Sequence, residues 1–96
     1  MLASDKIGKI AEDAAVNKLG RQVVERAFAA PITDSGGNDA WQITIVIKPN
    51  TAARLSGDNL LDTLHDIQTR LLSEGESRLP ILEYATQAEL EQVGSS

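Results

Sequence analysis

The stretch SGDNLLDTLHDIQTRLLSEG, residues 56–75, decides the fold. Its large apolar residues recur every three or four positions, which predicts one apolar stripe along a helix. The stripe consists of Leu60, Leu64, Ile67 and Leu71 and is widened by Leu61 and Leu72. Ser56 is a suitable N-cap and Gly75 a suitable left-handed terminator. We therefore expect a helix of about 25 Å that covers a small sheet, with Leu64 and Ile67 deeply buried beneath it.

Two strands flank this helix in the sequence. The segment WQITIVIK at 41–48 alternates, with Trp41 and three isoleucines on one face, and Pro49 ends it. The segment LPILEYA at 79–85 is a second, shorter apolar run. A strand–helix–strand unit normally forms a right-handed crossover between parallel strands. The pattern TQAE at 86–89 is typical of a capping box and predicts a short helix to about residue 92.

The N-terminal region reads mostly as helix from Asp5 to Ala30, where Pro31 would stop it. Its apolar residues form two stripes rotated away from each other, which indicates either two helices or one helix with two buried faces. An alternative for residues 27–33 is a strand with Phe28, Ala30 and Ile32 as its alternating residues, which Pro31 would limit to a sheet edge and which would make the loop after it a hairpin connection. Of the two, helix is the interpretation that we favour from the sequence.

Together these elements predict an α/β fold in one small domain, residues 1–96. A helical N-terminal region is followed by strand, helix, strand and a short C-terminal helix. The segment TDSGGND at 33–39 is rich in turn residues and is expected to be a flexible loop. The tail at 94–96 is expected to fray.

Two strands make a poor sheet on their own, and a chain of 96 residues without cysteine has few other ways to gain stability. We therefore expect a twofold homodimer, the commonest oligomer. Its interface would use the N-terminal apolar stripes. The residues are Ile7, Ile10, Ala14, Val16, Leu19 and Val23.

Charge and composition narrow the class of protein. The net charge is −5, and the excess lies after residue 50, where three arginines face eight acidic residues. This weighs against nucleic-acid binding, because the phosphate backbone repels an acidic surface. No apolar run approaches the roughly 20 residues that span a bilayer, and no secretory signal is visible, so we expect a cytoplasmic protein without membrane contact. Without cysteine there is no thiolate metal site, and we expect neither a metal nor a cofactor.

The connector between the first strand and the long helix is one candidate ligand site. Strand ends that lead into a helix are where open α/β sheets bind ligands, and the helix dipole favours anions there. Its polar residues are Lys48, Asn50, Thr51, Arg54 and Ser56. The segment has no phosphate-loop motif, so its chemistry is weakly specified.

A second candidate is a partner-binding surface formed by an aspartate ridge, Asp58, Asp62 and Asp66, on the long helix. Residues four apart share a helix face, and a carboxylate ridge suits a basic protein surface better than a metal. Trp41 is a further candidate because tryptophan is enriched at binding hot spots, although a core position is the interpretation that we favour for it.

No catalytic constellation is visible in the sequence. The sole histidine, His65, has an aspartate three residues earlier but no nucleophile at a recognisable spacing. Catalysis is left open but not favoured. The sequence favours a small non-enzymatic interaction module, an adaptor, inhibitor or regulatory subunit, that binds itself and another protein. The alternatives are an anionic-ligand sensor or enzyme that uses the connector at 48–57, and nucleic-acid binding through the N-terminal region, which carries most of the lysines.

Overall fold

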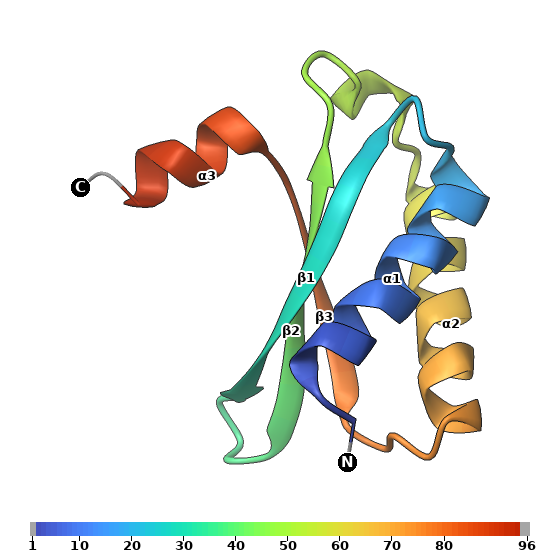
Figure 1. Cartoon of the computed structure of the whole chain (residues 1–96), viewed down its shortest axis with the longest axis vertical. Helices are drawn as coiled ribbons and strands as arrows, with labels where there is room; N and C mark the ends of the chain where they lie inside the picture. The colour runs from blue at the N-terminus through green and yellow to red at the C-terminus, as the bar shows by residue number, and fades with distance from the viewer. Residues whose placement is uncertain (1, 95–96) are drawn as a thin grey trace.

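The computed structural model describes residues 2–94, and it confirms a small α/β domain. In chain order the elements are α1 (Ser4–Leu19), β1 (Val24–Thr33), β2 (Asp39–Ile47), the 3-10 turn η1 (Ala52–Arg54), α2 (Gly57–Ser73), β3 (Leu79–Thr86) and α3 (Gln87–Gly94). Helices α1 and α2 lie side by side on one face of the sheet, while α3 projects from the opposite side (Figure 1). Of the predicted frayed tail, residues 95 and 96 lie outside the described residues.

The sheet has three strands in the order β1-β2-β3. Strand β1 runs antiparallel to β2, and β3 runs parallel to it. Helix α2 makes the predicted crossover between the two parallel strands. The predicted capping box at the start of α3 is also confirmed, because Thr86 N donates to Glu89 Oε1 at 2.9 Å and Glu89 N donates to Thr86 Oγ1 at 3.2 Å.

The prediction of helix up to Ala30 is wrong, and the edge-strand alternative is correct. Helix α1 ends at Leu19, because Gly20 adopts a φ of 91° and donates its N–H to Val16 O at 2.8 Å. The chain reverses there and continues as β1. The second apolar stripe is divided between two elements, because Val16 and Leu19 still belong to α1 whereas Ala27 belongs to β1. Pro31 lies on an edge strand, as the alternative required.

The loop between β1 and β2 is shorter than the predicted 33–39, because Thr33 and Asp39 belong to the strands. The Asp34 carboxylate accepts the backbone N–H groups of Gly36 and Asn38, both at 2.9 Å. This side chain thus holds the turn, which is otherwise exposed to solvent.

The core lies between the sheet and the helices. Trp41, Ile43, Ile45 and Ile47 face it, as the alternation predicts. Of the residues expected at a dimer interface, Ile7, Ala14 and Val23 are buried in this core, and Ile10, Val16 and Leu19 pack against it. The N-terminal stripes are thus covered by the chain's own sheet. A third strand also removes the two-strand argument on which the expected dimer partly rested.

Helix α2 is rotated relative to the expectation for its stripe. Thr63, Ile67 and Leu71 are its buried residues, so the burial of Ile67 is confirmed. Leu64 is only half-buried, and its predicted deep burial is wrong. The Thr63 hydroxyl donates to Asn59 O at 2.8 Å, which lets a polar residue occupy the buried face without an unpaired group.

Gly8 allows α1 to approach β1 closely. A Cβ at this position would lie 3.2 Å from Phe28 Cα and 3.3 Å from Ala27 O, so the backbone itself would have to move. We expect Gly8→Val to lower the free energy of unfolding by about 1–3 kcal/mol through overpacking. Urea unfolding measures this, with Lys9→Val at the exposed neighbouring position as the control for helix propensity. Equal losses in both variants would show that the close approach is unimportant.

Candidate functional site

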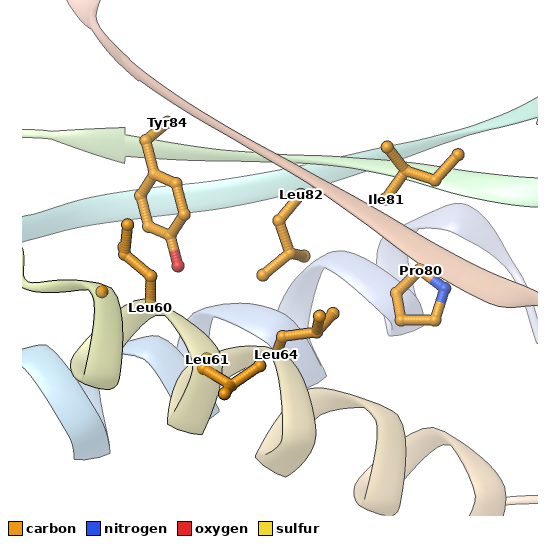
Figure 2. A pocket seen from close by; sticks show the side chains of 8 residues that line it. Leu60, Leu61, Leu64, Pro80, Ile81, Leu82 and Tyr84 are labelled. Atoms are coloured by element: carbon orange, nitrogen blue, oxygen red, sulfur yellow. The ribbon is translucent and has the colours of Figure 1, made fainter.

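An open apolar groove separates α2 from β3 (Figure 2). It has a volume of about 520 Å³. Helix α2 contributes Gly57, Leu60, Leu61 and Leu64, and β3 contributes Pro80, Ile81, Leu82 and Tyr84. No charged side chain lines it, so it can take up apolar groups rather than an anion.

The groove exists because the apolar arc of α2 is wider than the surface that covers it. The side of the arc with Thr63, Ile67 and Leu71 packs into the core. Leu60 and Leu64 lie at the boundary, and Leu61 on the far side is 52% exposed. The leucines that widened the predicted stripe are therefore those that the chain leaves uncovered, and a single helix face continues from the core into the groove.

Strand β3 forms the opposite wall. Leu82 and Tyr84 point toward α2, whereas Ile81 points the other way (Figure 2). Ile81 is 40% exposed, and Leu79 on the same face is also exposed. Strands buried on both faces read as continuous apolar runs. The segment LPIL at 79–82 has this character, yet β3 stands at the edge of the sheet.

The Tyr84 hydroxyl is the polar atom of the groove wall. It is buried and forms no hydrogen bond with the described residues. Burial raises the pKa of the Tyr84 phenol above its ordinary value, and the nearby Thr63 hydroxyl only partly offsets this. The phenol is therefore neutral at physiological pH, and the groove wall carries no charge.

The predicted aspartate ridge is divided in the structure. Asp66 is half-buried and pairs with Arg70 at 3.3 Å, so its charge is used within α2. Asp58 and Asp62 are exposed, and neither forms an ion pair with another described residue. They stand three residues before and one residue after Leu61. Asp58 therefore shares a side of α2 with the exposed Leu61, whereas Asp62 lies on the neighbouring, solvent-facing side of the helix.

The connector residues are not part of the groove lining. The Thr51 hydroxyl donates to Lys48 O at 2.6 Å, and the Ser56 hydroxyl accepts from Asn59 N at 3.1 Å as the predicted N-cap. Asn50 adopts a φ of 64° in the turn, and Arg54 is exposed in η1. The hydroxyl proton of Thr51 is therefore used within the connector, whereas the Ser56 hydroxyl accepts a bond and keeps its own proton to donate.

Trp41 lies in the core with an exposed fraction of 1%, next to a buried carboxylate that sequence reasoning missed. Glu76 is 4% exposed and accepts the backbone N–H groups of Leu2 and Arg78, both at 3.2 Å. The Arg78 guanidinium lies over the Trp41 ring, 5.9 Å from its centre, and also pairs with Asp39 at 3.3 Å. This cluster joins the N-terminus, β2 and the start of β3.

The pKa of Glu76 is the result of opposing influences. Burial alone would raise the pKa of this carboxyl, but the two backbone N–H donors, the Trp41 indole and the charge of Arg78 outweigh burial and lower it. The indole N–H lowers the pKa of Glu76 as a nearby donor, although it completes no hydrogen bond of good geometry with the described residues. Glu76 is therefore an ionised structural anchor. The sequence gave no sign of this role, because Glu76 opens a short polar segment, ESR at 76–78, that directly follows Gly75.

Residues 2–94 contain no group of three or more acidic, histidine or cysteine side chains placed to hold a metal ion. Within the same residues, no helix has the length and apolar character needed to cross a membrane. Comparisons with protein-family models, with curated proteins and with solved structures found no match to this chain. The groove is the best-formed candidate site in the part of the chain that the structure describes.

Proposed function

We propose that this protein is a non-enzymatic interaction module that binds another protein through the groove between α2 and β3. The observation that carries the proposal is the open apolar groove, whose α2 wall includes the exposed Leu61, and Ile81 is exposed on the opposite face of β3. Large apolar side chains gathered at an exposed site favour a binding surface, since a monomer gains nothing from leaving them in water. The role of adaptor, inhibitor or regulatory subunit agrees with the acidic surface and the small size of the domain.

The alternative of an anionic-ligand sensor has less support. The groove offers no cation, and the Thr51 hydroxyl of the connector already donates to Lys48 O. Nucleic-acid binding is likewise opposed by the net charge of −5. Self-association remains part of the proposal only if it uses a surface other than the N-terminal stripes, because those pack into the chain's own core.

A selection from displayed random peptides tests the proposed function. Peptides enriched on the wild-type protein should bind the variant Leu61→Asp at least about tenfold more weakly, because a carboxylate in the groove must be desolvated. Thr69→Asp, an exposed α2 position outside the groove lining, is the matched control and should bind as wild type. Enriched peptides that bind both variants equally, or no enrichment at all, would contradict the proposal.

A further inference from the structure

We propose that the groove receives an extended segment of a partner protein, which adds to β3 as a fourth strand and carries apolar residues flanked by lysine or arginine. This inference rests on the proposed function and specifies the chemistry of the partner. Three independent features of the described residues support it: an open strand edge, apolar surface on both sides of that edge, and unpaired carboxylates on α2, the helix that forms the other wall of the groove.

The first feature is the contrast between the two edges of the sheet. The outer edge of β1 is blocked: Glu12 Oε1 accepts the N–H of Ala27 at 3.1 Å, and Arg21 Nη1 donates to Glu25 O at 3.1 Å. A bulge between Val24 and Arg26 and a proline at position 31 disrupt it further. Such devices are how natural proteins prevent unwanted strand pairing.

The outer edge of β3 has no comparable protection. Within the described residues, β3 pairs only with β2, and no side chain is hydrogen-bonded to the backbone of residues 79–85 on its outer side. Only Pro80, near its start, removes a donor. Backbone groups that are left unpaired beside an apolar groove form the usual acceptor site for an added strand. The chain thus protects one edge of its sheet and leaves the other available.

The second feature is the apolar surface that surrounds this edge on both sides. Leu61 and Leu64 extend along the helix-covered side, and Leu79 and Ile81 are exposed on the opposite side. Side chains of a strand alternate between the two faces of a sheet. A strand paired with β3 would therefore place alternate residues against the α2 leucines and the others beside Leu79 and Ile81. A docked helix would cover only the groove.

The third feature decides between a foreign segment and a second copy of this chain. A second copy that paired β3 with β3 would bring its own α2 and β3 to the interface. Arg70 and Arg78 are the cations of the 57–86 segment, and both are already paired, with Asp66 and Asp39. Self-pairing of this segment would thus bring more carboxylates to Asp58 and Asp62 and no free cation from residues 57–86. A basic segment would neutralise them, and so charge complementarity favours a foreign partner.

The test uses the whole chain and a synthetic probe. The probe is an acetylated and amidated peptide in which three isoleucines alternate with threonines, with two lysines at each end. A second peptide has glutamates in place of the lysines, and a third is methylated on alternate backbone nitrogens along one edge. A fourth peptide is methylated along the other edge, so that whichever edge of the peptide pairs with β3 is blocked in one of the two methylated peptides. Binding is followed by amide NMR shifts, and strand addition by hydrogen exchange at residues 79–85.

We expect the lysine peptide to bind about tenfold more tightly than the glutamate peptide at low salt. Methylation along the pairing edge should reduce binding about tenfold or more, because it removes the interstrand hydrogen bonds. Binding should slow amide exchange within residues 79–85. The double variant Asp58→Asn with Asp62→Asn should weaken binding of the lysine peptide, whereas Asp13→Asn on α1, which faces Lys9, should leave it unchanged.

Several results would overturn the inference. If both methylated peptides bind as tightly as the unmethylated lysine peptide, strand addition is excluded. If the glutamate peptide binds as tightly as the lysine peptide, the basic partner is excluded. Failure of the lysine peptide to bind at millimolar concentration would also contradict it. If displayed peptides of another pattern still bind through Leu61 in these cases, the proposed function stands. Slow exchange, in the free protein, of the amides in 79–85 that do not bond to β2, together with a dimeric mass, would assign the edge to a second copy instead.

Discussion

Replacing Ile67 with alanine is expected to lower the free energy of unfolding by about 2–5 kcal/mol, the range for truncating a fully buried aliphatic side chain. Ile67 has no exposed surface and lies at the centre of the buried face of α2, between Thr63 and Leu71. The core around it is aliphatic apart from Trp41. Because these side chains are closely packed, they cannot move far enough to fill the cavity that the substitution leaves. Urea unfolding followed by circular dichroism measures the loss.

Two leucines of the same helix provide controls for the Ile67→Ala variant. Leu61→Ala should change stability by no more than about 0.5 kcal/mol, because the Leu61 side chain is largely in water. Leu64→Ala should fall between the two, since Leu64 lines the groove and is half-buried. A loss at Leu61 as large as that at Ile67 would mean that the groove is covered in solution, and the rotation of α2 described above would be wrong.

Much of the fold could be predicted from the sequence where two local signals agree. Helix α2 combines a strong apolar period with the Ser56 cap, and its cap hydrogen bond is present. Strand β2 combines strict alternation with β-branched residues, and its predicted inner face is the inner face of the structure. In these segments local preference and tertiary packing favour the same structure.

The segment that was wrongly predicted lacks this agreement. Residues 24–33 contain three alanines and two charged residues and follow directly on a helix, so local propensity favours continued helix. The decisive residue is Gly20, whose left-handed conformation ends α1, and the pairing of β1 with β2 then determines the strand. Strand propensity depends on the residues that pack beside a segment from neighbouring strands, and a single sequence does not show which residues these are.

The candidate site was harder to predict than the fold, for a geometric reason. The periodicity showed that α2 has a wide apolar arc, but it could not show which part of the arc the rest of the chain covers. A displacement of the covered part toward Thr63 is what leaves Leu61 and Leu64 at the groove. The signal that could have indicated the groove is the excess of apolar residues itself, at positions 61 and 72 and in the run 79–82.

Replacing Glu76 with alanine is expected to destabilise the protein by at least about 2 kcal/mol at neutral pH, since each buried donor left unpaired costs about 1–3 kcal/mol. The donors that lose their acceptor are the backbone N–H groups of Leu2 and Arg78. The Trp41 indole N–H loses its neighbouring carboxylate as well, and the Arg78 guanidinium loses a nearby anion. Chemical unfolding at pH 7 measures this loss.

The same carboxylate predicts how stability changes with pH. The pKa of Glu76 is lowered in the folded protein, so the folded state favours the ionised carboxylate more than the unfolded state does. The stability that it provides is therefore fully present above the ordinary pKa of 4.5 and is lost as the pH falls through the lower folded pKa. Glu76→Gln should be less stable than wild type at pH 7 and should lose less stability on acidification.

A control must separate Glu76 from Glu89, because the pKa of the Glu89 carboxyl is also lowered, by hydrogen bonds from the backbone N–H and hydroxyl of Thr86. Glu89 is fully exposed at the start of α3, whereas Glu76 ties the N-terminus to Trp41 and β3. We therefore expect Glu89→Gln to retain most of the acid sensitivity and Glu76→Gln to lose much of it. The reverse result would show that the buried cluster does not hold these elements together, and that the acid response comes from the cap of α3 instead.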